Sequence, residues 1–136
     1  RARLANYGQG LERFGLVHAD LRLANLLEAG DTTTVIDFDD CGFSWFLYDW
    51  GTAVSFIEHD PVVPELQAAW VDGYRSVAPL APEEEAELPT FVMLRRLTLI
   101  GWVSSHHEFS VEAAELGEEY TRSACDLAER FLTHVT

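Results

Sequence analysis

Two stretches of this chain decide the fold: HADLRLANLL over residues 18–27 and VIDFDDCGF over residues 35–43. Each contains a short apolar run, β-branched in the second stretch, and the turn residues Ala29-Gly30-Asp31 lie between them. Brief apolar runs between turn residues are typical of short strands. The pattern predicts strands over residues 16–18, 25–28 and 33–37, and an ordered loop over residues 38–47.

Three side chains with oxygen atoms lie in the loops or at the ends of these predicted strands. Asp20 lies in the first loop, Asn25 stands where the next strand begins, and Asp37 ends the third strand. We expect them to converge at one edge of a small β-ribbon. A carboxylate with an amide oxygen suits a hard cation such as Mg²⁺, which keeps several waters and binds phosphates. A second carboxylate nearby, free of the metal, is placed to take or orient a hydroxyl proton.

The remainder of the chain is predicted to be helical. The spacing predicts a helical tail over residues 1–13 that ends before Gly15, and helices over residues 48–59 and 64–77. A further helix starts at Pro82, and residues 91–103 are apolar on nearly all sides, which favours a buried central helix. Ser110 is placed to cap the last helix. The apolar stripe of that helix comprises Tyr120, Ala124, Leu127, Phe131 and Val135.

Composition limits the function classes. The chain has 136 residues, 48% of them hydrophobic, and a formal net charge of −14 at pH 7. This apolar content excludes a disordered chain, and the acidic balance argues against partners such as nucleic acid or an anionic membrane. No apolar run approaches the roughly 20 residues of a membrane-spanning helix. Cys41 and Cys125 lie far apart and make no metal pattern, so we expect free thiols and a cytoplasmic protein.

The two motifs together resemble the catalytic and metal-binding loops of kinases, in which Asp is followed by Asn and later by a strand-end Asp. Their form here is similar to the aminoglycoside phosphotransferase family, also called the phosphotransferase enzyme family. Among its members, the chain looks most like type II homoserine kinases and bacterial stress-response kinases. The resemblance covers about residues 13–58. It departs from protein kinases at Ala19, where they have Arg, and after Asp37, where Phe38-Asp39 replaces Phe-Gly.

The resemblance implies a role for each matching residue. Asp20 matches the catalytic base, and Asn25 and Asp37 match ligands of the Mg²⁺ ion that accompanies ATP. His18 and Asp49 match residues that brace the catalytic loop. The expected partners are therefore ATP and a small-molecule acceptor, which the acidic balance of the chain predicts to be cationic.

The resemblance also offers candidates for contact with substrate. Arg22 stands where relatives often carry His, which leaves its role open. Asp39 and Asp40 match a feature of a subgroup, and they either contact substrate or hydrogen-bond the loop. Glu58 completes the expected substrate-binding set. The candidates for lining a cation-binding pocket are Glu58, Asp60 and Glu108.

The resemblance implies an α+β fold, a protein-kinase-like C-terminal lobe with short β-ribbons at the catalytic loop and a mainly helical subdomain after it. We expect one domain over residues 1–136, with the catalytic and metal-binding loops in 14–50 and the helical subdomain in 51–136. Relatives carry an N-terminal β-lobe with a nucleotide-binding Lys, whereas all nine basic residues here are Arg. Gly8-Gln9-Gly10 lacks the strand and helix of a phosphate-binding loop. We therefore expect the N-terminal lobe to be absent and the lone lobe to be inactive.

Two other functions stay open. The first is a non-catalytic, kinase-like binding or dimerisation module. Without an N-terminal lobe the chain would expose an apolar face, and a second copy of the chain would cover that face in a homodimer. A metal-dependent phosphohydrolase would use Asp37, Asp39 and Asp40. His106-His107-Glu108 makes a poor zinc site, because neighbouring side chains on a helix point apart. Fold resemblance does not decide among sugar, amino-alcohol, amino-acid, antibiotic and protein acceptors.

Overall fold

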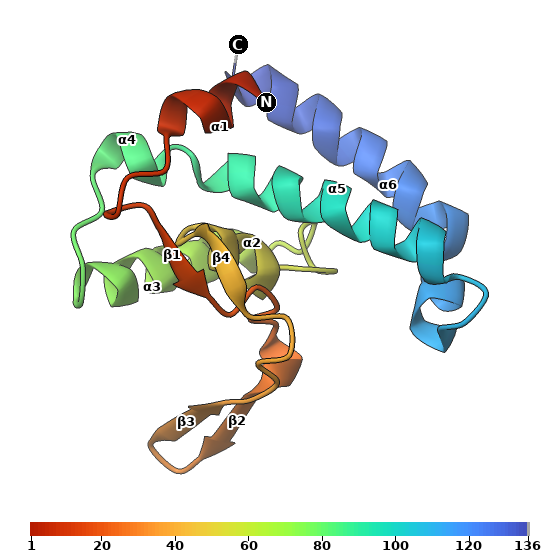
Figure 1. The fold of residues 1–136 in the computed structure, drawn as a ribbon, viewed down its shortest axis with the longest axis horizontal. Helices are drawn as coiled ribbons and strands as arrows, with labels where there is room; N and C mark the ends of the chain where they lie inside the picture. The colour runs from red at the N-terminus through yellow and green to blue at the C-terminus, as the bar shows by residue number, and fades with distance from the viewer. Residues whose placement is uncertain (136) are drawn as a thin grey trace.

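The computed structural model describes residues 1–135, and Figure 1 shows their fold. The elements in chain order are α1 (Ala2–Tyr7), β1 (Phe14–Val17), the 3₁₀ helix η1 (Leu23–Asn25), β2 (Leu26–Ala29), β3 (Thr32–Val35), β4 (Gly42–Trp45), α2 (Tyr48–Ala53), α3 (Val63–Arg75), α4 (Pro82–Glu85), α5 (Leu88–His106) and α6 (Val111–Val135). Short strands therefore precede a long helical part. The α+β class expected from the sequence is confirmed.

The strands form two separate antiparallel ribbons. β2 and β3 make a hairpin in which Leu26 faces Val35, and this hairpin projects from the rest of the molecule (Figure 1). β1 pairs with β4, so that Phe14 faces Trp45 with their rings edge to face at 5.5 Å. The prediction of a loop over residues 38–47 is wrong at β4. Its partner lies far away in the sequence, and pairing with a distant strand leaves no local pattern to detect.

The helical part is built around α5. α2 crosses α5 at Gly51, where an added Cβ would lie 2.5 Å from the carbonyl oxygen of Phe91, so only glycine allows this approach. Trp50 and Phe91 are almost fully buried at the crossing. α2 ends at Ala53, earlier than the predicted residue 59, and the chain then turns at Phe56, which has a φ of 72°.

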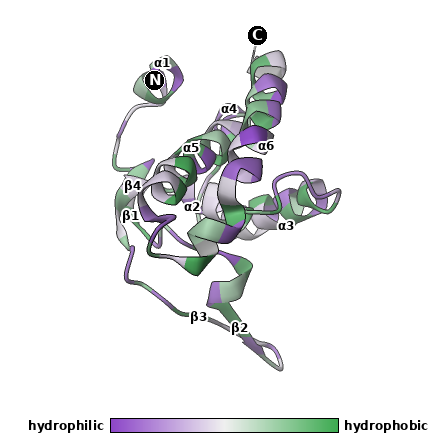
Figure 2. Ribbon diagram, turned by 90° about the vertical axis from the view of Figure 1, so that its right-hand side faces the viewer, coloured by the Kyte–Doolittle hydropathy of each residue, from purple (hydrophilic) through white to green (hydrophobic). Residues whose placement is uncertain are grey.

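α6 lies against α5 over much of its length (Figure 1). Ser110 accepts a hydrogen bond from the backbone N–H of Ala113 at 3.3 Å, as expected for a cap. Gly117, with a φ of 50°, interrupts the helical geometry. Figure 2 shows hydrophobic and hydrophilic residues mixed along α6. Two of its buried residues, Tyr120 and Ala124, belong to the predicted stripe, and a third, Ala113, lies outside it. None of the helices in residues 1–135 combines the length and hydropathy needed to cross a membrane.

Candidate functional site

The loop that carries Asp20 is held by the first turn of α2. Both carboxylate oxygens of Asp49 accept backbone hydrogen bonds, one from the N–H of His18 at 3.0 Å and one from the N–H of Ala19 at 2.8 Å. Thr52 Oγ1, one turn later, accepts from the N–H of Leu21 at 2.9 Å. Ala19 has a φ of 66°, a left-handed conformation that L residues adopt at a cost. These hydrogen bonds stabilise the strained loop and fix the direction of Asp20.

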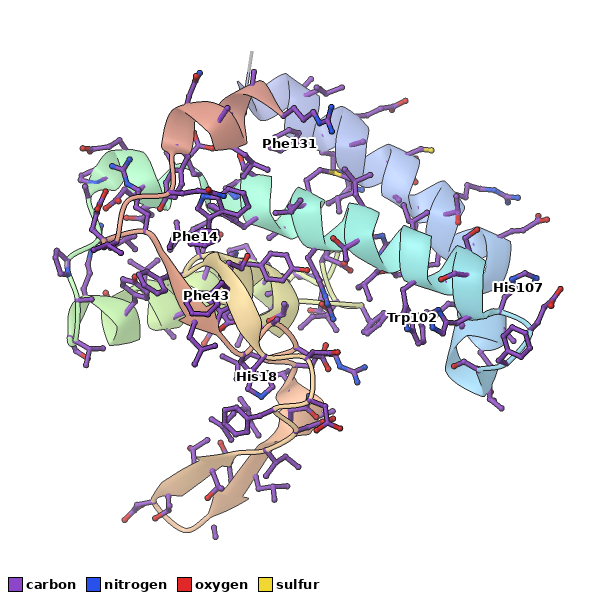
Figure 3. The ribbon with its side chains drawn as sticks, in the orientation of Figure 1. Phe14, His18, Phe43, Trp102, His107 and Phe131 are labelled. Carbon is purple, nitrogen blue, oxygen red and sulfur yellow. The ribbon has the colours of Figure 1, made fainter. Side chains whose placement is uncertain are left out.

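His18 connects this loop to the segment that follows β3. Its Nε2–H donates to the carbonyl oxygen of Ile36 at 2.9 Å, and its Nδ1 accepts from the N–H of Asp20 at 3.3 Å. One ring nitrogen therefore acts as donor and the other as acceptor, which is the pattern of a neutral imidazole. Figure 3 shows His18 at the base of the projecting hairpin. The ring is thus a structural link between the two motifs.

The carboxylate of Asp20 is surrounded by donors. Arg95, on α5, donates from Nη2 to Oδ1 at 2.5 Å. Arg22 Nε and Asn25 Nδ2 both donate to Oδ2, each at 3.1 Å. The Asp20 side chain is only 10% exposed, so these contacts define the direction in which its remaining lone pairs point.

Asn25 and Asp37 fit the requirements of a divalent cation. Asn25 uses Nδ2 for Asp20, donating to its backbone oxygen at 2.8 Å as well as to its carboxylate, so Oδ1 of Asn25 points away from both. Ile36 donates its N–H to the carbonyl oxygen of Asn25 at 3.0 Å, which brings Asp37 beside this amide. Asp37 is exposed and has a φ of 66°. An amide oxygen and one free carboxylate leave room for the waters and phosphate oxygens that Mg²⁺ prefers.

A cavity of about 320 Å³ opens beside Asp20. Its lining includes Asp20, Arg22, Asp40, Phe56, Arg95 and Trp102. Trp102 lies on the side of α5 that faces the loop with Asp20 (Figure 3) and stacks on His106 with ring centroids 5.2 Å apart. The cavity therefore combines carboxylates, guanidinium groups and aromatic faces.

The expected substrate-binding residues separate into different environments. Arg22 and Asp40 line the cavity, whereas Asp39 is exposed and outside its lining. Glu58 is corrected: its side chain is 2% exposed and forms an ion pair with Arg96 at 3.1 Å. A carboxylate that is enclosed and paired in this way is structural and has no access to substrate.

The other acidic and histidine candidates also lie elsewhere. Asp60 is exposed and accepts a hydrogen bond from the N–H of Val62 at 2.9 Å, so it shapes the turn before α3. Glu108 is exposed at the end of α5, next to His107, and neither lines the cavity. Within the described part of the chain, no group of three or more His, Cys, Asp or Glu side chains is arranged to hold a metal.

Sequence reasoning missed the contribution of α5. Arg95, Thr98 and Trp102 lie on one face of that helix and line the cavity. Their spacing of three and four residues is what a helix needs to bring side chains to one face. The available signal was a pair of arginines in an otherwise apolar helix, because a buried charge requires a partner.

The fold and the arrangement of the two loops define a kinase-like phosphotransferase lobe. The sequence profile of the phosphotransferase enzyme family (APH) matches residues 1–85, and the chain belongs to that family. The resemblance inferred from the two motifs is therefore confirmed.

Named relatives are kinases of small molecules. The chain is 31% identical to the amicoumacin kinase of Bacillus subtilis (strain 168) over 117 residues, which cover 79% of this chain and 34% of that protein. It is 36% identical to the homoserine kinase of Neisseria meningitidis serogroup B over 80 residues, 56% of this chain and 26% of that one. The chain thus spans about a third or less of these curated relatives.

Two solved structures are also similar. A microcompartment-associated aminopropanol kinase superposes with a TM-score of 0.85 at 55% identity, covering 97% of this chain and 42% of that one. The amicoumacin kinase hAmiN, in complex with AMP-PNP, Ca²⁺ and Ami, superposes with a TM-score of 0.63 at 26% identity, covering 88% and 37%. The kinase-like fold of this chain is therefore shared with enzymes that phosphorylate small molecules.

Proposed function

We propose that the protein transfers the γ-phosphoryl group of ATP to the hydroxyl group of a small amino alcohol. The observation that carries this proposal is the cavity of about 320 Å³ that has Asp20 in its wall and Asp40 and aromatic faces around it. The similarity to an aminopropanol kinase at 55% identity supports the same acceptor class.

The chain's own residues account for the positioning that phosphoryl transfer needs. The carboxylate of Asp20 accepts a hydrogen bond from the acceptor hydroxyl and directs its oxygen toward the γ-phosphorus, taking the proton as the new bond forms. Asn25 and Asp37 would hold Mg²⁺, which supplies charge neutralisation on the ATP phosphates. Arg22, beside Asp20 at 3.1 Å, adds positive charge where the transferred group arrives.

The lining of the cavity supports a cationic acceptor. Asp40 offers a carboxylate, and Trp102 offers an aromatic face to which ammonium groups are attracted. The chain's net charge of −14 adds a long-range attraction for cations. A small amino alcohol has both features that the cavity addresses, a hydroxyl for Asp20 and an ammonium for Asp40.

The test is a kinase assay on the complete gene product with an amino alcohol and with the corresponding alcohol that lacks the amine. Phosphorylation of the first and not of the second is expected. Asp20→Asn is expected to abolish transfer while leaving nucleotide binding intact, and unchanged turnover in this variant would refute the assignment of Asp20.

A matched pair of variants tests the amine contact. Asp40→Asn is expected to raise the KM for the amino alcohol, because it removes the carboxylate from the cavity. Asp39→Asn removes the same charge from an exposed neighbour outside the lining and is the control. Equal increases in KM for the two substitutions would show that only the overall negative charge of the protein affects binding of the amino alcohol.

The metal site is tested by calorimetric titration of ATP with Mg²⁺ into this chain and into Asp37→Asn. Binding that the substitution removes would support the assignment of Asp37 and Asn25. Because the chain has no Lys to pair the ATP phosphates, we expect weak nucleotide binding and no turnover by these residues alone. Exposed free thiols at Cys41 and Cys125 suit the reducing cytoplasm that we propose as its compartment.

A binding module or homodimer is the second candidate, and exposed apolar residues favour it. Leu16 on β1 and its cross-strand partner Phe43 on β4 are 65% and 78% exposed. Such a pair requires a cover, which we propose to be either adjoining sequence or a second copy. Light scattering at high concentration distinguishes them, since a strict monomer excludes the homodimer. The phosphohydrolase alternative is disfavoured, because the described acidic side chains form no three-ligand cluster.

A further inference from the structure

We propose that Arg95 is a positioning residue that leaves Oδ1 of Asp20 as the oxygen that receives the acceptor hydroxyl. This inference rests on the proposed function and goes further, since it names the reacting atom and the group that orients it.

The hydrogen bonds of Asp20 distinguish its two oxygens. A carboxylate oxygen has two in-plane lone pairs. Oδ2 accepts two hydrogen bonds, from Arg22 Nε and Asn25 Nδ2, so both of its lone pairs are used. Oδ1 accepts only the bond from Arg95 among the residues that the structure describes, at 2.5 Å, so one lone pair remains. An incoming hydroxyl therefore finds its acceptor at Oδ1.

Arg95 is itself fixed on three sides. Its Nε donates to Ser55 Oγ at 3.2 Å, its Nη1 donates to the carbonyl oxygen of Ala19 at 3.2 Å, and its Nη2 donates to Asp20. The residue is 8% exposed. A planar guanidinium group that is hydrogen-bonded through all three nitrogens has one orientation. Its hydrogen bond to Oδ1 therefore fixes the orientation of the Asp20 carboxylate.

The same helix face also forms the wall of the cavity. Thr98 and Trp102 follow Arg95 at three and seven residues and line the cavity with it. One helix, α5, thus orients the carboxylate of Asp20 and also forms part of the wall of the substrate cavity. The free lone pair of Oδ1 therefore keeps a fixed position relative to the bound substrate. Without Arg95 the carboxylate is held only through Oδ2, by Arg22 and Asn25, and Oδ1 loses the hydrogen bond that fixes its direction.

The experiment compares Arg95→Ala with Arg96→Ala in the complete gene product, after an unfolding titration has shown that each is folded. We expect Arg95→Ala to lower kcat by about 100-fold, the usual effect of misplacing a reacting group by ~1 Å, with little change in the KM for ATP. Guanidinium ion at millimolar concentration is expected to restore part of this kcat by occupying the vacated site. Arg96→Ala is expected to lose stability, to retain kcat in the folded fraction and to show no rescue.

A folded Arg95→Ala with wild-type kcat would overturn the proposal, as would a loss of kcat that guanidinium leaves unchanged. If Arg95→Ala does not fold, Arg95→Lys replaces it: one ammonium cannot bind Ser55, Ala19 and Asp20 together, so kcat is expected to fall by about 10-fold. Wild-type kcat in that variant would equally overturn the proposal. Asp20→Asn separates the two hypotheses, because an active Asp20→Asn refutes the proposed function, whereas an inactive one beside an unaffected Arg95 variant refutes this inference alone.

Discussion

Two adjacent arginines on α5 end in contrasting environments. Arg95 reaches Asp20 at the wall of the cavity, and both side chains in that pair are 10% exposed. Arg96 reaches Glu58, and in that pair the side chains are 3% and 2% exposed. Arg96 also lies over the ring of Tyr120, with 3.4 Å between its guanidinium carbon and the ring centroid.

The difference between the pairs lies in what surrounds the carboxylate. Asp20 keeps Arg22 and Asn25 as further donors and faces a cavity large enough for a small molecule. Glu58 is enclosed with Arg96 and is not among the residues that line the cavity beside Asp20. A buried ion pair therefore indicates a functional site only where one partner also has access to a ligand.

The largest effect that we expect comes from breaking the enclosed pair. Glu58→Gln keeps the shape of the side chain but leaves Arg96 with an uncompensated charge away from water. Loss of one partner of a buried ion pair costs about 3–5 kcal/mol of unfolding free energy. Urea titration of the purified chain measures this cost.

A double substitution provides the control. Arg96→Met with Glu58→Leu removes both charges, and apolar replacements of buried ion pairs are often neutral. We expect this protein to recover most of the stability lost in Glu58→Gln. Equal losses in the single and double variants would mean that shape, and not charge pairing, makes this region stable.

Alkaline pH is expected to act on the enclosed region. Burial, and secondarily the charge of Glu58, raises the pKa of Tyr120 from 10.0 to about 12. The folded protein therefore holds this proton more tightly than the unfolded chain, and the resulting stabilisation is complete below pH 10 and is lost as the pH rises to 12. A shift of this size corresponds to roughly 3 kcal/mol.

Tyr120→Phe isolates this effect. The buried hydroxyl has no hydrogen-bond partner in residues 1–135, so its removal is expected to cost little at neutral pH. Denaturant titrations of both proteins at neutral pH and between pH 10 and 12 should show a smaller loss in the variant. Tyr7 and Tyr74, whose pKa values are also raised by burial, remain in both proteins. Parallel losses in the two proteins would contradict the role of Tyr120.

Gly51→Ala is expected to disturb both regions at once. The added Cβ would lie 2.5 Å from the carbonyl oxygen of Phe91, so α2 has to move away from α5. Overpacking of this kind costs about 1–3 kcal/mol. The same shift moves Asp49, which holds the catalytic loop from α2, so turnover should fall together with stability. Gly73→Ala, at a helical glycine with open space around it, is the control: it should leave turnover unchanged and should not lower stability, because Ala favours a helix over Gly.

The motif residues were predictable because their signal is local. The positions of Asp20, Asn25 and Asp37 follow from sequence spacing and from strand ends. Asn25 donates to Asp20, and Ile36, next to Asp37, donates to the backbone of Asn25, whereas the roles of the three residues stay predictions. The misassignment of Glu58 had a different origin. Its partner, on α5, is 38 residues away, and no local pattern distinguishes a carboxylate that lines a cavity from one that is enclosed beside it.

The fold shows the same division between local and distant information. The extents of α3 and α6 follow from apolar spacing, whereas β4 depends on its pairing with β1. The environments of Arg95 and Arg96 could not be separated by sequence either. Both are arginines in one apolar run, and only the direction of each side chain, about 100° apart around a helix, assigns them to different partners.

The smallest effect that we expect is also the one that most finely separates the two arginines. Ser55→Ala removes the acceptor of Arg95 Nε, a hydrogen bond of 3.2 Å, and leaves the contacts of Arg96 intact. Its cost in unfolding free energy should be about 1 kcal/mol, well below that of Glu58→Gln. Because Nη1 and Nη2 keep their acceptors, kcat should fall by only a few-fold, measured in the same assay as the Arg95 variants. A loss as large as that of Arg95→Ala would show that Ser55, and not the carbonyl of Ala19, sets the orientation of the guanidinium group.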